Sequence, residues 1–448
     1  MQRYHGRDTT LQEDEMSTNA EEFKELARRT GIEVIDRDGR TFWQGKDTGM
    51  KKPAGPLQDK KIGIIVASEF SDFQAYYLAL YLTEAAADVD FLLVDWVTWK
   101  HTRPTLAEKG VQGMWGLSLE PIPTMAEGRQ GFRKFREAEL DSYDAFLVLG
   151  GHSADILQTE VEVQECLRNA HESGVIIGAI GGGLLPLISA GVVNGVRCTG
   201  NRIVSFMLEK VSEFDDLPVV RDGTIISARD TVDTPEFCRE ICRAFDTGYE
   251  DGRSGILTGK RILIIAGEDF EDVELVAPTM EFLYRGADLT IATFPPPMRA
   301  RPPLLGVDVV LGNFGVSVPL QEIPDDRYTL KKLSEVVMDE FDLVQIPGAF
   351  CPWNMVAAGD PVNFLARAYD AGKTIAAICH GPIPVAAAGL VEGKMLAGVG
   401  ACNDAVTIMG GTYSEEWSAV VDGRIVSGRV PVDVPEFLDA VTLSLLTT

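Results

Sequence analysis

The strongest chemical signal in this chain lies near its C-terminus, where the apolar run 374–378 stops at Cys379 and continues as His380-Gly381-Pro382. We predict a strand over residues 374–378 and a helix over 384–388, so that Cys379 occupies a sharp turn between them. Such a turn presents a nucleophile beside backbone N–H groups at the positive end of a helix dipole, which should lower the pKa of a thiol. Cys379 is therefore the predicted nucleophile, with a buried structural cysteine as the alternative.

This segment has an altered copy earlier in the chain. Residues 174–195 align without a gap to 372–393, and Gly181-Gly182-Gly183 stands where Cys379-His380-Gly381 stands. Three further pairs of segments align in the same order, at offsets of 198 or 200: 60–67 with 260–267, 143–150 with 341–348, and 222–229 with 422–429. The pattern indicates an internal duplication in which the first copy has lost the nucleophile.

The elements that must position these residues follow an α/β pattern. Short, continuous β-branched runs alternate with longer helical stretches, which is typical of a parallel sheet covered by helices on both faces. We assign 1–56 to an N-terminal arm with a helix over 20–29 and a loop-like stretch after it. Repeat one spans 57–248 and repeat two spans 256–448. The polar stretches 96–139 and 295–333 are expected to be irregular insertions that border the sites at the carboxyl ends of the strands.

Composition limits the function classes. The 448 residues include 41 basic and 67 acidic side chains, a formal charge of −26, which argues against nucleic acid or an anionic membrane as partner. No apolar run approaches the roughly 18 residues of a membrane helix. Seven cysteines without a C-x-x-C pair, and no apolar signal segment, favour a reducing cytoplasm. Neither a metal nor a cofactor is expected. Cys238 and Cys242, at helical spacing, and Cys351 are interpreted as packed thiols.

A second motif follows the first strand of repeat two, in the acidic segment 268–274. Together with the elbow at Cys379, it resembles the ThiJ/PfpI superfamily, the Parkinsonism-associated protein family, over residues 57–448. The resemblance implies two tandem flavodoxin-like parallel-sheet sandwiches, related to class I glutamine amidotransferases. It also implies that Glu271 is the carboxylic acid held against Cys379, where it could share or shuttle a proton. The alternative for Glu271 is a solvated helix start.

The segment 347–353 stands where many relatives have P-G-G-x-x-P-E. By resemblance, the backbone N–H groups of Gly348, Ala349 and His380 form an oxyanion site. Trp353 replaces the glutamate of relatives described as proteases, which argues against a Cys-His-Glu triad. The His380 side chain is either a general base or merely structural, because adjacent side chains on a tight turn are expected to diverge.

Repeat one has lost both reactive positions. Ser71 stands at the position of Glu271, and Gly181 stands at that of Cys379. Joint loss predicts a pseudo-enzyme that supports assembly or shapes the other site, so that replacing Ser71 should barely affect turnover.

In single-domain relatives an acidic residue after the glycine turn of one subunit reaches the cysteine site of the other. Asp155 aligns with Trp353, so we predict that Asp155 or its neighbour His152 approaches His380 across the interface of an intramolecular pseudo-dimer. The alternative is that Asp155 only caps a helix over 156–168.

For function, the resemblance implies a cofactor-independent enzyme on a small-molecule carbonyl, similar to the glyoxalase III branch that converts 2-oxoaldehydes such as methylglyoxal to 2-hydroxy acids. Cys379 would add to the aldehyde and Glu271 would move the proton. Two alternatives stay open. One is a cysteine hydrolase or hydratase on an amide, nitrile or isocyanide carbon, although isocyanide hydratases usually have Thr where His380 stands. The other is a redox-responsive sensor or holdase in which Cys379 is oxidised to a sulfinic acid.

Overall fold

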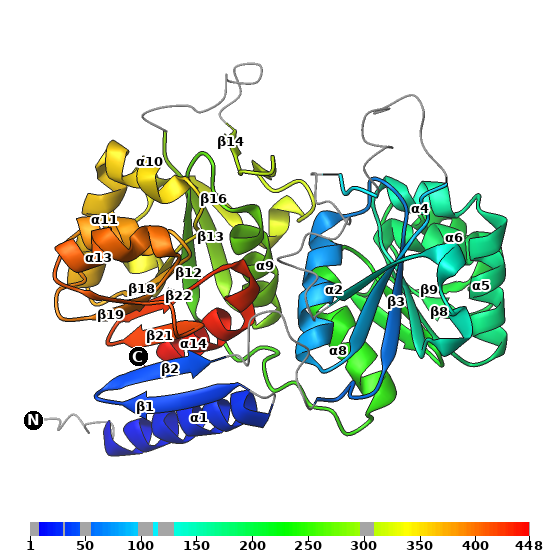
Figure 1. Cartoon of the computed structure of the whole chain (residues 1–448), viewed down its shortest axis with the longest axis horizontal. Coiled ribbons are helices and arrows are strands. Elements are labelled where there is room, and N and C mark those ends of the chain that lie inside the picture. Colours follow the sequence, from blue (N-terminus) through cyan, green and yellow to red (C-terminus); the bar gives the residue numbers. More distant parts are fainter. Residues whose placement is uncertain are drawn as a thin grey trace, which may run out of the picture.

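The protein is seen here as a computed structural model, which describes residues 9–29, 32–44, 55–96, 111–114, 130–295 and 309–447. Two α/β units stand side by side, and each has a central sheet between two layers of helices (Figure 1). The same fold is therefore built twice, as the two tandem parallel-sheet sandwiches expected from the duplication.

The sheet of repeat one has seven strands, all parallel to their neighbours except the antiparallel edge strand β10. Their order across the sheet is β10 (Val219–Asp222), β11 (Ile225–Ala228), β7 (Ile176–Ile180), β6 (Ala145–Val148), β3 (Lys61–Val66), β4 (Asp88–Leu93) and β5 (Gln130–Lys134).

The sheet of repeat two contains the same seven positions in the same order and two strands more. The order is β1 (Glu33–Arg37), β2 (Arg40–Gln44), β21 (Ala419–Asp422), β22 (Ile425–Gly428), β18 (Thr374–Ile378), β17 (Leu343–Ile346), β12 (Arg261–Ala266), β13 (Asp288–Thr293) and β16 (Thr329–Lys332). The central strands are buried along nearly their whole length, which explains why they read as continuous apolar runs.

Helices cover both faces of each sheet. Repeat one contributes α2 (Asp72–Glu84), α4 (His152–Leu157), α5 (Val161–Glu172), α6 (Leu184–Ala190), α7 (Ser205–Val211) and α8 (Thr234–Phe245). Repeat two contributes α9 (Asp272–Tyr284), α10 (Cys351–Ala358), α11 (Asp360–Asp370), α12 (Pro382–Ala387), α13 (Asn403–Ile408) and α14 (Val434–Leu446). Three short strand pairs lie outside the main sheets: β8 (Arg197–Cys198) with β9 (Glu213–Phe214), β14 (Val310–Leu311) with β15 (Ser317–Val318), and β19 (Met395–Ala397) with β20 (Thr412–Ser414).

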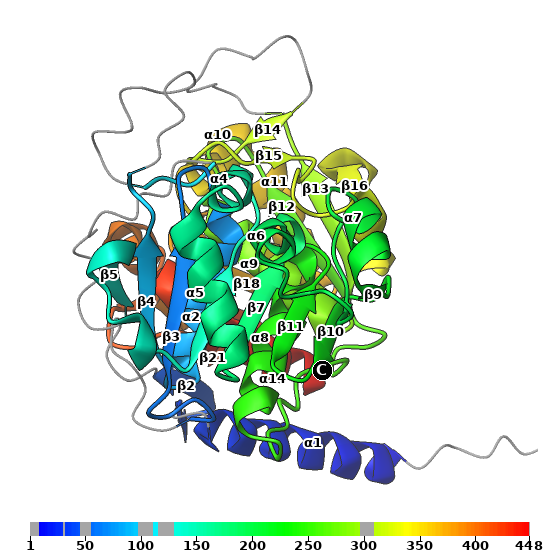
Figure 2. The same ribbon diagram turned by 90° about the vertical axis from the view of Figure 1, so that its right-hand side faces the viewer.

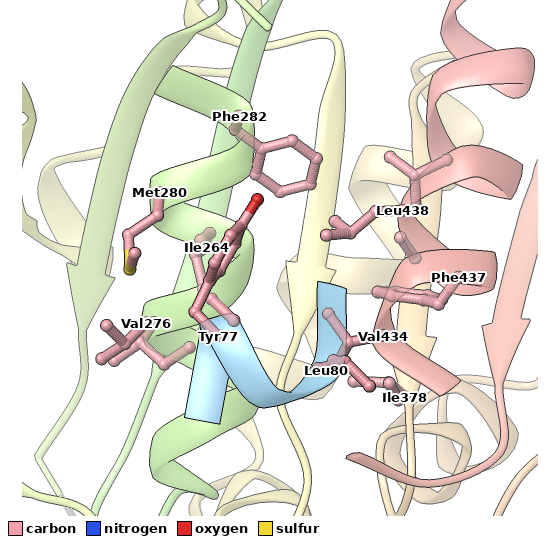
Figure 3. Packing of buried hydrophobic residues seen from close by; sticks show 14 of the residues in the cluster. Tyr77, Leu80, Ile264, Val276, Met280, Phe282, Ile378, Val434, Phe437 and Leu438 are labelled. Atoms are coloured by element: carbon pink, nitrogen blue, oxygen red, sulfur yellow. The ribbon is translucent and has the colours of Figure 1, made fainter. Parts of the chain in front are cut away.

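The two units share one hydrophobic core, because α2 and α8 pack against α9 across the interface. Helix α2 is buried on almost all sides, in agreement with its mainly apolar sequence DFQAYYLALYLTE. Its Tyr77 lies among side chains of repeat two, with Met280 and Phe282 of α9 and Leu438 of α14 around it (Figure 3). The interface is thus part of the protein interior rather than a wet contact between independent domains.

The N-terminal segment differs from the sequence-based expectation. Helix α1 (Thr9–Arg29) is longer than the predicted 20–29, and the stretch expected to be loop-like forms the hairpin β1–β2. Strand β2 pairs antiparallel with β21, so the segment that precedes repeat one extends the sheet of repeat two (Figure 1). Phe42 and Trp43 of β2 are buried in this position. The pairing of β2 with β21 also covers an edge of the sheet whose backbone groups would otherwise be unpaired.

The expected insertions are only partly irregular. Each contains an edge strand, β5 in the first and β16 in the second, and the second also holds the β14–β15 pair. Residues 97–110, 115–129 and 296–308 of these stretches lie outside the described residues. Viewed from the side of repeat one, β14 and β15 lie near α10, at the end of the molecule opposite α1 (Figure 2).

Candidate active site

Cys379 lies on a tight turn between β18 and α12. Strand β18 ends at Ile378 as predicted, and Cys379 has a left-handed backbone with φ of 60°. This strained conformation is held by two backbone hydrogen bonds, from Cys379 N to Gly428 O at 3.0 Å and from Gly381 N to Ile378 O at 2.7 Å. A non-glycine residue in this region costs on the order of 1–3 kcal/mol and persists where the surrounding structure enforces it. The geometry is that of a nucleophile elbow.

Three polar groups surround the Cys379 sulfur on its open side. The backbone N–H groups of Ala349 and His380 donate hydrogen bonds to Sγ. The His380 Nδ1 atom lies 3.3 Å from Sγ, so the side chains of these adjacent residues converge, and the expectation that they diverge is wrong. The half-buried position of His380 lowers its pKa, which leaves a neutral imidazole at neutral pH. A neutral ring nitrogen next to a thiol can accept its proton.

A buried carboxyl group, Glu274, completes the surroundings of the sulfur. Its side chain forms a hydrogen bond with Cys379, and its Oε2 atom accepts the Gly348 N–H at 2.7 Å. Its Oε1 atom has no hydrogen-bond partner among the described residues. Complete burial, together with the nearby Glu271, raises the pKa of Glu274 well above its usual range. Glu274 is therefore a neutral acid that can donate to the sulfur.

Glu271 does not occupy the position against Cys379 that the resemblance implied. It is the N-cap of α9, and its Oε2 atom accepts the N–H groups of Val273 at 2.7 Å and Glu274 at 3.0 Å. Because α9 begins at Asp272, the residue that turns toward the elbow is Glu274, three positions further on. Burial raises the pKa of Glu271 to about 7, since the two N–H bonds offset only part of the desolvation.

The expected lowering of the Cys379 pKa is also wrong. The side chain is only 7% exposed, and this burial raises the thiol pKa. A negative charge on Glu274 adds to the effect, whereas the Ala349 and His380 N–H groups oppose it. A neutral Glu274 removes the unfavourable charge and supplies one more donor. The resting site is thus a thiol whose ionised form is stabilised by specific donors and not by solvent.

The backbone N–H groups of Gly348 and Ala349 bind different partners in the site. The Gly348 N–H is used by Glu274, so of the three N–H groups expected to form an oxyanion site only those of Ala349 and His380 are directed at the Cys379 sulfur. A side chain at position 348 would bring a Cβ atom within 2.6 Å of both the Cys379 Cβ and the Glu274 Oε2, and therefore only glycine fits. Ala349 has φ of 55°, and this turns its N–H toward the elbow.

Neither Asp155 nor His152 forms a hydrogen bond or ion pair with His380 among the described residues. His152 is exposed, and its Nδ1 lies 2.7 Å from Glu69 Oε2. Asp155 Oδ1 accepts from the Gln158 side chain at 2.6 Å. Both contacts are inside repeat one. The capping alternative is wrong too, because Asp155 lies within α4, whose N-cap is Gly151.

Repeat one preserves the shape of this site without its reactive groups. Gly181, at the position of Cys379, keeps the left-handed backbone with φ of 54°. Gln74, at the position of Glu274, accepts the Gly150 N–H through Oε1 at 2.8 Å. The pairing of Gln74 with Glu274 was missed by sequence reasoning. The signal was present, since Ser71 and Gln74 have the S-x-x-Q spacing of a helix N-terminus and differ from Glu271 and Glu274 at both positions.

Exposed aromatic side chains occur in two segments connected to the site. Phe350, which follows Ala349, is 52% exposed, Trp353 of α10 is 39% exposed, and Phe314 is 55% exposed. The loop of Phe314 is tied to the site, because its N–H donates to Asp272 at 2.8 Å. Cys351 is fully buried and accepts the Gly267 N–H at 3.1 Å, as a packed thiol would.

Within the ranges that the structure describes, no three or more His, Cys, Asp or Glu side chains gather where they could hold a metal ion. In the same part of the chain, no helix is long and apolar enough to cross a membrane.

Fold and site together define a tandem α/β protein with a cysteine elbow in its second unit and a degenerate copy in its first. The DJ-1/PfpI family model matches residues 60–244 and again 260–443, and the chain belongs to this family. Among relatives, protein DJ-1 homolog D of Arabidopsis thaliana is 27% identical over 315 residues, which cover 68% of this chain and 78% of that protein. A deglycase of Pyrococcus abyssi is 29% identical over 174 residues, 39% of this chain and 92% of the relative.

Among solved structures, DJ-1beta of Drosophila melanogaster matches with 20% identity and a TM-score of 0.36, over 43% of this chain and 93% of that one.

Proposed function

We propose that repeat two is a cysteine enzyme that converts a 2-oxoaldehyde to a 2-hydroxy acid without a cofactor. One observation carries the proposal: the Cys379 sulfur is held between the neutral acid Glu274, the neutral imidazole of His380 and two backbone N–H donors. These are the groups needed to form a thiol adduct of an aldehyde and to move its protons. The name deglycase, borne by archaeal relatives, is in keeping with chemistry at such a carbon.

The first step joins sulfur to the aldehyde carbon. As Sγ of Cys379 attacks, its proton passes to Nδ1 of His380, and the carbonyl oxygen becomes an oxyanion that the Ala349 and His380 N–H groups stabilise. The imidazolium then returns the proton to this oxygen, which gives a hemithioacetal. Glu274 donates a hydrogen bond to the sulfur while it carries negative charge.

The second step moves a proton between two carbons. His380 Nδ1 removes the proton from the hemithioacetal carbon, and the electron pair shifts onto the neighbouring carbonyl to give an enediolate. The proton is then delivered to that neighbouring carbon, while the hemithioacetal hydroxyl passes its own proton to the enolate oxygen and becomes the thioester carbonyl. The product is a thioester of the 2-hydroxy acid on Cys379. Water then attacks the thioester, the C–S bond breaks and the thiol regains its proton. In total, one 2-oxoaldehyde and one water molecule are converted to one 2-hydroxy acid, and no external oxidant or reductant is needed.

The test is the formation of 2-hydroxy acid from methylglyoxal and phenylglyoxal by the full-length protein. Cys379→Ser and Glu274→Gln should each abolish most of the turnover. Cys166→Ser is the matched control, because Cys166 lies in repeat one and is likewise 7% exposed. Absence of acid formation in the wild-type protein, with both substrates, would reject the proposal.

Further assays on the same protein and variants separate the alternatives. Release of ammonia from amides, or hydration of nitriles or isocyanides, that depends on Cys379 would identify a hydrolase or hydratase. Conversion of Cys379 to a sulfinic acid by dilute peroxide, without turnover of any carbonyl substrate, would identify a redox sensor.

A further inference from the structure

Glu322 of repeat two reaches the degenerate pocket of repeat one. Its Oε2 atom accepts hydrogen bonds from Ser71 Oγ at 2.6 Å and from Thr231 Oγ1 at 3.1 Å. Ser71 and Thr231 are almost fully buried, and Gln74 supports Thr231 through a bond from Nε2 to Oγ1 at 2.9 Å. A carboxylate that accepts two buried hydroxyl donors is a strong and specific anchor.

The anchored segment, residues 309–327, is called the strap below. At its other end the strap is hydrogen-bonded along the loop that carries Glu271. Asp269 N donates to Leu311 O at 2.7 Å, and Asn313 N donates to Phe270 O at 2.8 Å. The buried carboxylate of Asp272 accepts the N–H groups of Phe314 and Val316, both at 2.8 Å. One continuous segment therefore connects the loop that carries Glu271 to repeat one.

Between its two ends the strap is packed and not loose. Four of its apolar side chains are nearly inaccessible and belong to the core shared by both units: Val316, Val318, Leu320 and Ile323. A second contact with repeat one follows Glu322, where Arg327 lies 3.9 Å from Asp233. A displacement at the Glu322 end would thus be transmitted to Asp272 and its neighbour Glu271.

We propose that Glu322 is a positioning residue and that the degenerate pocket of repeat one is its socket. Repeat one holds the strap, and the strap holds the turn at Glu271 and Asp272. Because Glu271 caps α9, this turn fixes the start of the helix and thereby keeps Glu274 buried beside Cys379. The loss of glutamate at position 71 suits this role, because a carboxylate there would repel Glu322 whereas the Ser71 hydroxyl binds it. Repeat one is retained because repeat two depends on its hydroxyl groups to hold Glu322. This proposal predicts that loss of the Ser71 hydroxyl affects turnover, whereas the sequence alone predicted that replacing Ser71 would barely affect it.

The test uses alkylation of Cys379 by iodoacetamide as well as turnover of phenylglyoxal, in the full-length protein. Glu322→Ala should open the site, so that alkylation at pH 7 accelerates and kcat/KM falls, each by about 2- to 30-fold. The double variant Ser71→Ala/Thr231→Ala, which removes both hydroxyl donors of repeat one, should change the alkylation rate and kcat/KM in the same directions. Adding Glu322→Ala to that pair should cause little more, because the same anchor is already lost. Glu322→Gln should lie close to wild type, since its amide oxygen can still accept both hydroxyl bonds.

Asp326→Ala is the matched control, because Asp326 is an exposed acidic residue of the same strap. If Glu322→Ala lowers only the melting temperature and matches Asp326→Ala in alkylation rate, the anchor has no influence on the site and the proposal is overturned. If Glu322→Ala does not fold, the repeat-one pair, which leaves the strap intact, decides in the same way. The inference rests on Cys379 being the reactive group, but alkylation needs no substrate. A wild-type protein without turnover would therefore reject the proposed reaction and leave this test in force.

Discussion

Gln74 and Glu274 bind the same backbone group in the two halves of this protein. Gln74 Oε1 accepts the Gly150 N–H at 2.8 Å, and Glu274 Oε2 accepts the Gly348 N–H at 2.7 Å. The two side chains have nearly the same shape and differ in whether they can release a proton. Repeat one therefore shows the arrangement that the site of repeat two would take if its acid were replaced by an amide.

Glu274→Gln should therefore keep the fold and lose the chemistry. We expect turnover to fall on the order of 10²- to 10³-fold, because the carboxyl O–H that stabilises the charge on the sulfur is replaced by an amide N–H, which is a weaker donor. The melting temperature should change little, since Gln at this position already fits repeat one. Steady-state kinetics and thermal unfolding measure both effects. The reciprocal Gln74→Glu should create no activity, because Gly181 offers no thiol. Retention of more than about a tenth of wild-type turnover would contradict the role of Glu274.

Glu271→Gln should have a smaller effect on turnover than Glu274→Gln, but a clear effect on the pH dependence of stability. Burial raises the pKa of Glu271 to about 7 in the folded protein, above its ordinary value of 4.5. The folded state therefore binds this proton more tightly than the unfolded state. Its contribution is complete below about pH 4.5 and is lost as the pH rises through 7, on the order of 3 kcal/mol in total.

The measurement is the free energy of unfolding in denaturant at pH 5, 6, 7 and 8. In Glu271→Gln the free energy of unfolding should fall less steeply as the pH rises. At pH 8 this variant should be at least as stable as wild type. Exposed Glu416→Gln serves as the control and should follow wild type. Equal slopes for wild type and Glu271→Gln would mean that Glu271 is ionised without cost, contrary to its burial.

Cys379 should be the first of the seven cysteines to react with iodoacetamide in the native protein. All seven thiols are free and buried, but only the Cys379 sulfur accepts from the N–H groups of Ala349 and His380 and forms a hydrogen bond with the buried carboxyl group of Glu274. Because burial raises its pKa, the rate should keep increasing as the pH rises from 7 to 9. Peptide mass spectrometry at timed intervals gives the rates. Equal labelling of Cys166, or a rate that is already constant below pH 7, would contradict this reading of the site.

Glu281 should make a large contribution to the stability of the interface between the two units. Its Oε1 lies 2.8 Å from Nη2 of Arg239 in repeat one, and its Oε2 accepts from Arg285 Nε at 2.9 Å, all three side chains being buried. Removal of one member of a buried pair leaves an uncompensated charge, at a cost of about 3–5 kcal/mol.

Glu281→Ala should therefore lower the free energy of unfolding by about that amount and expose the linker 246–255 to proteolysis. Joint replacement of Glu281 and Arg239 by leucine or methionine should recover much of the loss, because the buried charges that remain, Arg253, Arg285, Asp251 and Asp439, balance and pair with one another. A cost below about 1 kcal/mol for Glu281→Ala would show that water reaches the network.

The sequence by itself determined the family, the duplication and the fold class. These depend on local patterns, namely the buried run 374–378, the turn at Cys379 and the repeated order of segments, and such patterns are set by neighbours along the chain. The strand over 374–378 has the predicted bounds for this reason. The loss of the thiol from repeat one can likewise be read directly from Gly181.

Only the tertiary structure decided which acid meets the thiol and what the first unit contributes. The choice of Glu274 over Glu271 depends on where α9 begins and on the Gly348 N–H, which arrives from a distant strand. The bond between Ser71 and Glu322 joins residues far apart in sequence, so no local pattern indicates it. The pKa directions of Cys379 and Glu274 were likewise out of reach, because desolvation is a property of the packed interior and not of the residue or its neighbours in the chain.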